Sequence, residues 1–222
     1  IYDYSSNHWF MFSTPILSNG GTTRGLPISC FLNHVPDSRH GLSAHYDENI
    51  WLASSGGGIG GYWGEVRSDG VSTSNGSKST GSIPFMHVVD SQMLAFNQGT
   101  TRRGSYAAYL DISHPEVEEF MIMRKESGGD INRKCLNLHH GINITNAFLD
   151  AIRNDDDWRL IDPKSGDAVK IVKARELWSK ILETRAETGE PYLVNIDTCN
   201  DALPKEQREL GLEVKQSNLC SE

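Results

Sequence analysis

The chain has 222 residues, of which 37% are hydrophobic and 23% are charged, a composition typical of a globular protein with a sizeable core. Its formal net charge of −8 argues against direct, sequence-independent binding to nucleic acid, which needs a basic face. No apolar run approaches the ~20 residues of a membrane span, and nothing resembles a signal peptide. We therefore expect a cytoplasmic protein without membrane contact.

The cysteines indicate the redox compartment of the protein. The two ends of the chain indicate whether it is a piece of a longer protein. Four cysteines are widely spaced and form no C-x-x-C pair: Cys30, Cys135, Cys199 and Cys220. This spacing favours reduced thiols in the cytosol over a disulfide framework. The chain starts at Ile1 rather than Met and stops at Glu222, just after an extended stretch. We interpret residues 1–222 as a single partial domain, a piece of a longer protein.

The first part of the chain is expected to hold loops and one helix. Residues 1–30 are rich in Ser, Thr, Asn and Gly, which predicts loops with short strands near 10–16 and 28–32. Apolar residues at helical spacing predict a helix over 42–55. The glycines at 56–61 are expected to end this helix.

The middle of the chain alternates helices and strands. Residues 70–82 are nearly all Ser, Thr, Gly and Asn, which predicts a mobile surface loop. An amphipathic pattern predicts a helix over 83–97, and a strand is expected over 105–112. Pro115 opens the next helix, with acidic residues in its first turn, and a strand is expected over 136–144.

The last part continues this alternation. Thr145 is the expected N-cap of a helix over 147–153. The further predicted elements are a hairpin over 158–161 and 168–172, a helix over 174–187 ended by Gly189, a strand over 192–196 and an extended stretch over 213–222. Strands alternating with helices place the chain in the α/β class.

The glycines at 56–61 formally satisfy the G-x-G-x-x-G dinucleotide fingerprint. That site needs a strand before the glycines, a helix after them and an acidic residue about 20 positions on. Here a helix is predicted before them, Tyr62 and Trp63 follow, and the acidic residue is absent. A helix cap and tight packing turn is the better interpretation. Close approach of the backbone to a ligand stays open, because only glycine allows it.

Two further groups of polar residues are candidate binding sites. The loop over 98–104 carries Arg102 and Arg103, which suit a phosphate or a base edge but also an ordinary solvated loop. The eight histidines show no metal-ligand spacing, and the adjacent His139 and His140 face opposite ways in a strand. No metal site is therefore expected.

The end of the chain is its most informative segment. In an extended stretch, Asn218, Cys220 and Glu222 share one face, while Leu219 points into the protein. A neighbouring carboxylate raises the pKa of a thiol, so this cysteine is not suited to act as a thiolate nucleophile. A thiol that donates a hydrogen atom needs no low pKa. The alternative is a partly buried structural cysteine.

With Gln216 and Ser217 before it, this segment resembles the N-x-C-x-E finger loop of the class I ribonucleoside-diphosphate reductase large subunit. Further segments match the same family in the same order: Thr14–Gly20 (T-P-x-x-x-N-G), Ile28–Cys30, Gly57–Gly60, Gln98–Gly104, and Glu187–Tyr192 followed by Ile196–Asn200. Each motif is weak alone, but the ordered set covers nearly the whole chain.

The resemblance implies an α/β fold, about the first half of a ten-stranded α/β barrel, with the finger loop at its C-terminal end. It implies that the thiyl radical of Cys220 takes the 3′ hydrogen of a ribonucleoside diphosphate. Glu222 would accept the 3′-hydroxyl proton, and Asn218 would hydrogen-bond the substrate. Cys30 would be one of the two thiols that reduce the 2′ carbon. Two further residues would hold ribose or phosphate, namely Thr14 and Ser29.

The resemblance also implies regulation and partners. Asp37, Ser38 and Arg67 would contact an effector, a deoxynucleoside triphosphate or ATP. Gln98 and Arg102 would lie on the specificity loop that relays the effector's identity to the substrate base. The implied partners are a small subunit whose di-metal centre generates the radical, the remaining part of the catalytic subunit, and thioredoxin or glutaredoxin. No cofactor is expected to bind this chain directly.

The chain departs from the family in what it lacks. The redox partner of Cys30 is absent, and neither Cys135 nor Cys199 lies where that partner belongs. We therefore expect the isolated polypeptide to be inactive. The alternative function is a non-catalytic nucleotide-binding half-barrel that keeps the effector site.

Overall fold

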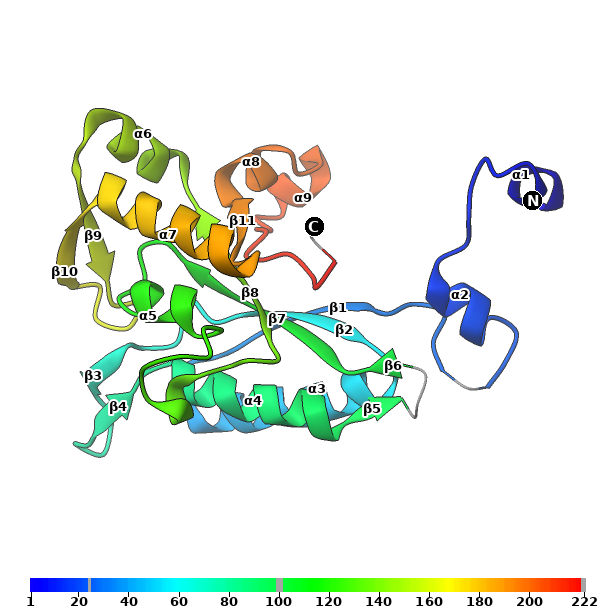
Figure 1. The fold of residues 1–222 in the computed structure, drawn as a ribbon, viewed down its shortest axis with the longest axis horizontal. Coiled ribbons are helices and arrows are strands. Elements are labelled where there is room, and N and C mark those ends of the chain that lie inside the picture. The colour runs from blue at the N-terminus through cyan, green and yellow to red at the C-terminus, as the bar shows by residue number, and fades with distance from the viewer. Residues whose placement is uncertain (24, 99–101, 221–222) are drawn as a thin grey trace.

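The central sheet has five strands, all parallel, in the order β1-β2-β7-β8-β11 (Figure 1). The computed structural model describes residues 1–23, 25–98 and 102–220. The strands are β1 (Cys30–His34), β2 (Gly58–Tyr62), β7 (Ser105–Asp111), β8 (His139–Ile144) and β11 (Tyr192–Asn195). Because strand order follows chain order, right-handed crossovers place the connecting helices on one face of the sheet. We call the opposite face the inner face.

The helices lie in the connections between these strands, as the alternating pattern predicts. They are α3 (Arg39–Ser54) between β1 and β2, α4 (Ile83–Ala95) between β2 and β7, α5 (Val117–Ile122) between β7 and β8, and α6 (Asn146–Asn154) and α7 (Ala174–Thr188) between β8 and β11. The predicted caps are confirmed. The Thr145 hydroxyl accepts a hydrogen bond from the Phe148 amide, and Gly189 ends α7 with a φ of 80°.

Strand β7 shows how the two faces of the sheet differ. Tyr106 and Leu110 join the large core beneath the helices, whereas Ala107 and Tyr109 lie on the inner face with Tyr62. Strand β7 is almost wholly buried, as expected of a parallel strand covered on both sides. The inner face is therefore covered too, although no connecting helix lies on it.

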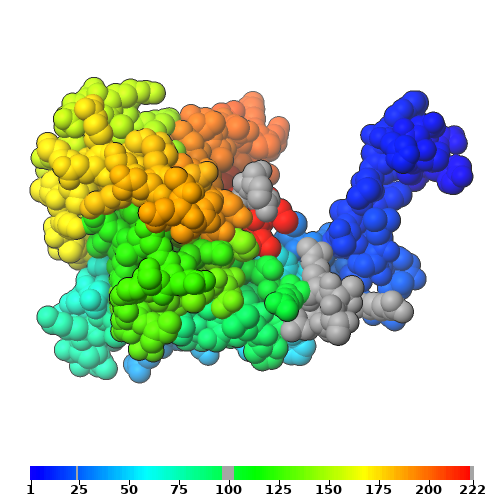
Figure 2. Space-filling view, viewed as in Figure 1, coloured from blue at the N-terminus to red at the C-terminus, as the bar shows by residue number. Residues whose placement is uncertain are grey.

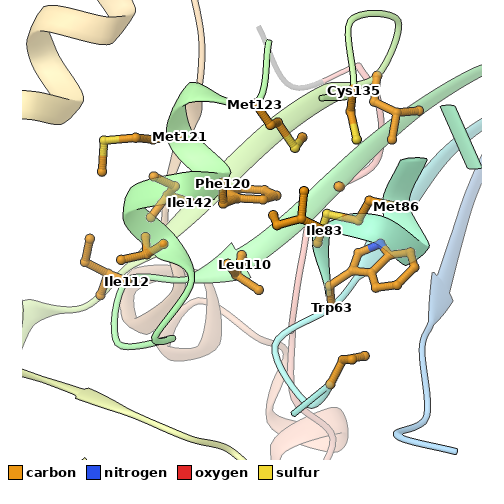
Figure 3. Packing of buried hydrophobic residues seen from close by; sticks show 14 of the residues in the cluster. Trp63, Ile83, Met86, Leu110, Ile112, Phe120, Met121, Met123, Cys135 and Ile142 are labelled. Carbon is orange, nitrogen blue, oxygen red and sulfur yellow. The ribbon is translucent and has the colours of Figure 1, made fainter. Parts of the chain in front are cut away.

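The large core lies between the sheet and its helices (Figure 3). Trp63, Ile83, Met86 and Phe120 are fully buried in it. Burial of each such side chain contributes about 1.5–3 kcal/mol to the free energy of folding, which is the main force holding the helices onto the sheet.

Two antiparallel hairpins flank the sheet. The predicted hairpin is confirmed as β9 (Asp157–Ile161) and β10 (Ala168–Lys173). The segment 70–82, predicted as a loop, instead carries a hairpin of β3 (Asp69–Ser72) and β4 (Lys78–Thr80). Its turn is fixed by Thr73, whose hydroxyl bonds the Ser77 carbonyl, and by Gly76 at a φ of 80°. Polar turn residues thus close a hairpin here rather than form an irregular loop. Its mobility stays a prediction.

The glycines at 56–61 do more than end the helix, contrary to the prediction of a cap and packing turn. Gly56 does turn the chain after α3, with a φ of 76°, but Gly58–Tyr62 is the second strand of the sheet. Strand β2 pairs with β1 on one side and with β7 on the other, and every one of its residues is buried. A strand rich in glycine carries no side-chain alternation, so the pattern could not reveal it.

The N-terminal residues form an arm rather than strands. A strand was expected near 10–16, but α1 (Tyr2–Ser6) and α2 (Thr14–Asn19) are the elements of this region. Pro15 occupies the first turn of α2, where its missing N–H costs nothing. The arm extends away from the body of the molecule (Figure 2).

The remaining elements are short. They are β5 (Asn97–Gln98), β6 (Arg102–Arg103), the 3-10 helix η1 (Ile131–Arg133), α8 (Ile196–Asp201) and α9 (Lys205–Glu209). The predicted extended stretch runs on from α9 through residues 213–220, which the structure shows in neither helix nor strand. Among the described residues, no helix is long and apolar enough to cross a membrane.

Candidate active site

Residues 213–220, which we call the finger segment, run across the inner face of the sheet. The side-chain amide of Gln216 donates to the Asn33 carbonyl near the end of β1 (2.9 Å), and the Tyr109 hydroxyl donates to the Asn218 carbonyl (2.7 Å). A Cβ atom on Gly60 would lie 2.7 Å from the Cα of Asn218 and closer still to the carbonyl oxygen of Ser217. The finger backbone therefore lies directly on the glycines of β2, which allow this approach because they lack side chains.

The tip of the finger segment is oriented as its alternation predicts. Leu219 packs against Tyr62, Ala107 and Tyr109 on the inner face, and Cys220 is exposed. Glu222, the expected proton acceptor, lies outside the described residues.

Asn218 has an unusual polar atom. Its side-chain oxygen is buried and has no hydrogen-bond partner among the described residues. A buried amide oxygen without a partner is costly, so this atom is suited to receive a donor from a bound ligand.

Cys30 lies beside this tip. It begins β1, is exposed, and is the register partner of Gly58 in β2. Leu219 contacts Gly58 from the inner face, 3.0 Å from where a Cβ would lie. Cys30 and Cys220, distant in sequence, are therefore brought to the same end of β1 and β2.

The two expected substrate-binding residues are placed differently. Ser29 is 9% exposed, and its carbonyl accepts a hydrogen bond from the Gly58 amide (2.6 Å), which ties it to the tip region. Thr14 is the first residue of α2 on the N-terminal arm, apart from the strands (Figure 1).

Asp37, Ser38 and Arg67, the expected effector residues, line one cavity of about 500 Å³. The Arg67 guanidinium binds both carboxylate oxygens of Asp37, with Nε–Oδ1 at 3.0 Å and Nη2–Oδ2 at 2.9 Å. This hydrogen bonding raises the pKa of Arg67. Ser38 caps α3 by accepting from the Gly41 amide (2.9 Å). The β3–β4 hairpin supplies hydroxyl and amide groups to the lining of the same cavity.

Apolar side chains complete that cavity: Leu42, Val66 and Phe85. A cavity lined by both apolar and polar side chains is suited to a ligand that has a flat ring and polar groups. The residues expected on the specificity loop, Gln98 and Arg102, are backbone register partners in the two-residue pair β5–β6. Residues 99–101 between them lie outside the described residues.

Known proteins of similar sequence and structure identify the family of this chain. The family model for the ribonucleotide reductase barrel domain matches residues 28–222. The chain belongs to this family. The match includes the finger segment, the glycine strand, Cys30 and the cavity beneath the β3–β4 hairpin.

Individual relatives agree with the family match. A Frog virus 3 (isolate Goorha) protein assigned as a ribonucleoside-diphosphate reductase large subunit is 51% identical over 220 residues, covering 99% of this chain and 38% of that protein. The ribonucleoside-diphosphate reductase subunit alpha of Helicobacter pylori (strain ATCC 700392 / 26695) is 33% identical, covering 100% and 31%. The solved Actinobacillus ureae class Id ribonucleotide reductase alpha subunit matches with a TM-score of 0.81 at 30% identity, covering 100% and 37%.

The reductase-family chain therefore spans less than two fifths of the length of these relatives. The structural likeness extends over its whole length, which confirms the predicted α/β class and agrees with a partial barrel. The matched region of this chain includes its five-stranded parallel sheet, with helices on one side and the finger segment on the other.

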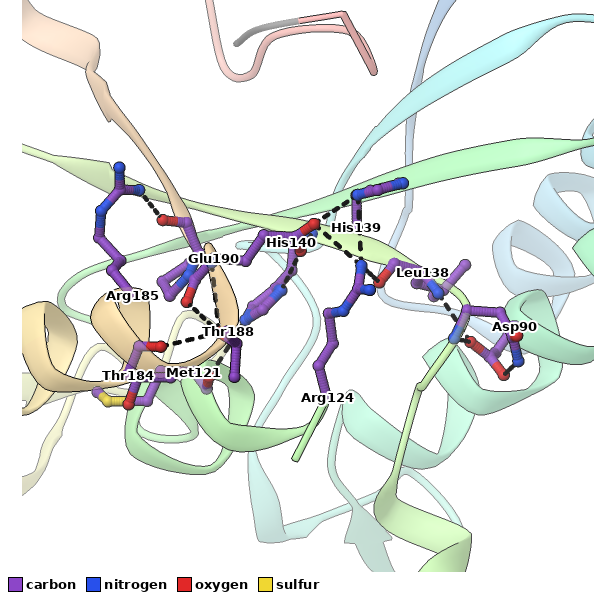
Figure 4. A network of polar contacts seen from close by, with 12 residues as sticks. Asp90, Met121, Arg124, Leu138, His139, His140, Thr184, Arg185, Thr188 and Glu190 are labelled. Atoms are coloured by element: carbon purple, nitrogen blue, oxygen red, sulfur yellow. Dashed lines mark hydrogen bonds and ion pairs between the residues drawn. The ribbon is translucent and has the colours of Figure 1, made fainter. Parts of the chain in front are cut away.

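One polar cluster of this reductase-family chain was not predicted (Figure 4). Glu190 Oε1 contacts Arg124 (3.0 Å) and His139 Nδ1 (2.5 Å), while Oε2 contacts His140 Nδ1 (2.9 Å). Burial opposes ionisation of Glu190, but the hydrogen bonds from both histidines and the charge of Arg124 outweigh it and lower the pKa of this carboxyl. His140 is fully buried whereas His139 is not, as expected for strand neighbours.

The adjacent histidines thus share a carboxylate, one oxygen each. Within the described ranges, no group of three or more His, Cys, Asp and Glu side chains is arranged to hold a metal ion. The sequence signal that could have indicated the cluster is the pair His139–His140 in a buried strand, since a buried imidazole needs a partner.

Proposed function

We propose that this chain supplies the first half of the catalytic barrel of a class I ribonucleoside-diphosphate reductase. The observation that carries the proposal is the N-L-C tip, lying on the glycine strand at the same end of the sheet as Cys30. The reaction reduces ribonucleotides to deoxyribonucleotides through a thiyl radical.

Each residue at the tip has a separate role in this proposal. Cys220, as a thiyl radical, takes the 3′ hydrogen of the substrate, and Glu222 accepts the proton of the 3′ hydroxyl. Asn218 hydrogen-bonds the substrate, and its unpartnered buried oxygen supports this role. Cys30 is one of two thiols that reduce the 2′ carbon. Ser29, beside Cys30, and Thr14 hold ribose or phosphate.

Regulation is proposed at the cavity around Asp37 and Arg67. Asp37, Ser38 and Arg67 bind a deoxynucleoside triphosphate or ATP, and the apolar side chains that line the cavity contact the base. Gln98 and Arg102 carry the identity of the effector to the substrate base. Such a relay is a free-energy coupling between two sites, so the substrate must change effector affinity by the same factor.

The proposal requires partners. A small subunit with a di-metal centre generates the radical, and the remaining part of the catalytic subunit supplies the second cysteine of the redox pair. Thioredoxin or glutaredoxin restores the thiols, and the reaction takes place in the cytoplasm. The isolated 222-residue polypeptide is expected to be inactive.

The test uses the complete catalytic subunit that contains this chain, mixed with its small subunit, a ribonucleoside diphosphate and a dithiol. Cys220→Ser and Cys30→Ser should each abolish deoxynucleotide formation. Cys199→Ser is the matched control, because Cys199 lies in α8, and should leave turnover unchanged. Turnover by Cys220→Ser at the wild-type rate contradicts the proposal, as does steady turnover by the isolated polypeptide.

A second candidate function is a non-catalytic nucleotide-binding half-barrel. The observation that favours it is that Asp37, Ser38 and Arg67 line a cavity of about 500 Å³ whose lining includes neither Cys30 nor Cys220. If this function holds, calorimetry should show deoxynucleotide binding that Arg67→Ala removes, together with no turnover when every partner is present.

A further inference from the structure

The backbone of the finger segment obtains its hydrogen bonds from groups other than the backbone of a neighbouring strand. Among the described residues, no backbone-to-backbone hydrogen bond joins residues 213–219 to a strand. The segment is nevertheless half-buried from Val214 to Leu219. Buried backbone groups require partners, so side chains of the surrounding elements must supply them.

Asn200 supplies two of these partners at once. It lies in α8, its Oδ1 accepts from the Val214 amide (2.7 Å), and its Nδ2 donates to the Val214 carbonyl (3.0 Å). The same Nδ2 donates to the Ile196 carbonyl within α8 (2.9 Å), so the amide group is held in one orientation. A side-chain amide here pairs with one residue of the finger segment as a neighbouring strand would.

Asn143 holds the next residue. From β8, its Nδ2 donates to the Lys215 carbonyl (2.8 Å) and to Asp111 Oδ1 (2.9 Å). The other oxygen of Asp111 accepts from the Tyr62 hydroxyl (2.5 Å). Asn143 is 1% exposed, so it cannot exchange the Lys215 carbonyl for water.

These contacts fix the base of the finger segment, and Gly60 and Tyr109 fix the part near its tip. The distance from Val214 to Cys220 is six residues, so a shift at the base moves the tip thiol. A misplacement of about 1 Å in a reacting group costs on the order of 100-fold in rate.

We propose that Asn200 and Asn143 are positioning residues that set the place of the Cys220 thiol by holding the backbone of Val214 and Lys215. Their hydrogen bonds to the finger segment go to Val214 and Lys215, at its base, and not to the tip. The inference rests on the proposed function, because it assigns these amides a purpose in that reaction.

The test compares Asn200→Ala with Asn195→Ala in the complete catalytic subunit. Asn195 is a matched control because it caps α8 through the Thr198 amide and contacts Asn146, not the finger segment. Both variants lose side-chain hydrogen bonds at the same helix, and thermal midpoints show whether the losses in stability match. Only Asn200→Ala releases the finger segment.

We expect Asn200→Ala to lower kcat by about 30-fold or more, because the thiol moves. The substrate KM should change by less than about 3-fold, because Ser29 and Thr14 stay in place and only Asn218, of the proposed binding residues, lies on the finger segment. Trypsin should cleave after Lys215 about 10-fold faster in native Asn200→Ala, because that cleavage needs the finger backbone to leave the sheet. Asn195→Ala should match the wild type in both measurements. Asn143→Ala should reproduce the loss in kcat.

The inference is overturned if Asn200→Ala and Asn195→Ala have the same kcat and the same cleavage rate. In that case the wild type still turns over and the proposed function stands. If instead the wild-type complex shows no turnover, the proposed function fails, and the cleavage rates alone decide whether Asn200 holds the finger segment.

Discussion

Replacing Gly60 with alanine tests whether the finger segment lies on β2 as described. The new Cβ would lie 2.7 Å from the Asn218 Cα and nearer to the Ser217 oxygen, and both are backbone atoms. Ordinary carbon contacts are about 3.5–4.0 Å, so the finger backbone must move by about 1 Å. Strand β2 cannot move instead, because it is paired on both sides. Overpacking of this kind costs about 1–3 kcal/mol.

A shift of this size at Asn218 carries Cys220 with it. We expect Gly60→Ala to lower kcat by about 100-fold in the steady-state assay of the complete subunit. Gly58→Ala is the matched control on the same strand and face, because its Cβ would meet the flexible side chain of Leu219, which can rotate away. It should lose less than about 5-fold. Equal activity of Gly60→Ala and Gly58→Ala would refute the placement of the finger backbone.

Two further predictions concern other parts of the chain. Glu190→Gln should lower the free energy of unfolding by about 3 kcal/mol at pH 7 relative to the exposed control Glu126→Gln, measured by urea unfolding, because Arg124 loses its buried anion. The pKa of the Glu190 carboxyl is lower in the folded state than in the unfolded state. The extra stability of the wild type is therefore complete above the unfolded-state pKa of about 4.3 and is lost as the pH falls below it. A stability difference that grows on acidification would contradict the described contacts of Glu190. Burial raises the pKa of the Cys135 thiol, so iodoacetamide should label exposed Cys30 and Cys220 about 100-fold faster than Cys135 in the native protein. Equal labelling of the three would show that Cys135 is not buried.

Local sequence signals were enough for the elements that depend on local physics. The helix over 174–187 has an apolar face and a terminal glycine, and α7 forms with Gly189 at its end. Thr145 has the side chain that a helix N-terminus needs, and it caps α6. The expected strand near 10–16 failed because Pro15 also suits the first turn of a helix, and the following residues adopt that alternative as α2.

The candidate site depended on residues far apart in sequence. The alternation at Asn218, Leu219 and Cys220 gave the correct direction for Leu219, since a side-chain period of two is a local property. The convergence of Asp37 and Arg67 on one cavity was expected only from the family resemblance. The charge pair between them is long-range, and no spacing rule predicts it.

The glycines of β2 show why the contact between this strand and the finger segment could not be predicted from the sequence. The sequence predicts that Gly58 and Gly60 belong to a helix cap and tight packing turn, with a dinucleotide site as the alternative, because these are local reasons for glycine. Their actual role depends on Ser217, Asn218 and Leu219, which arrive at β2 from more than 150 residues later in the chain. A glycine that leaves room for a distant backbone has the same local sequence as one that turns the chain. Only the position of the distant segment distinguishes these two roles of glycine. In this chain, the finger segment lies on Gly58 and Gly60, so these glycines support it.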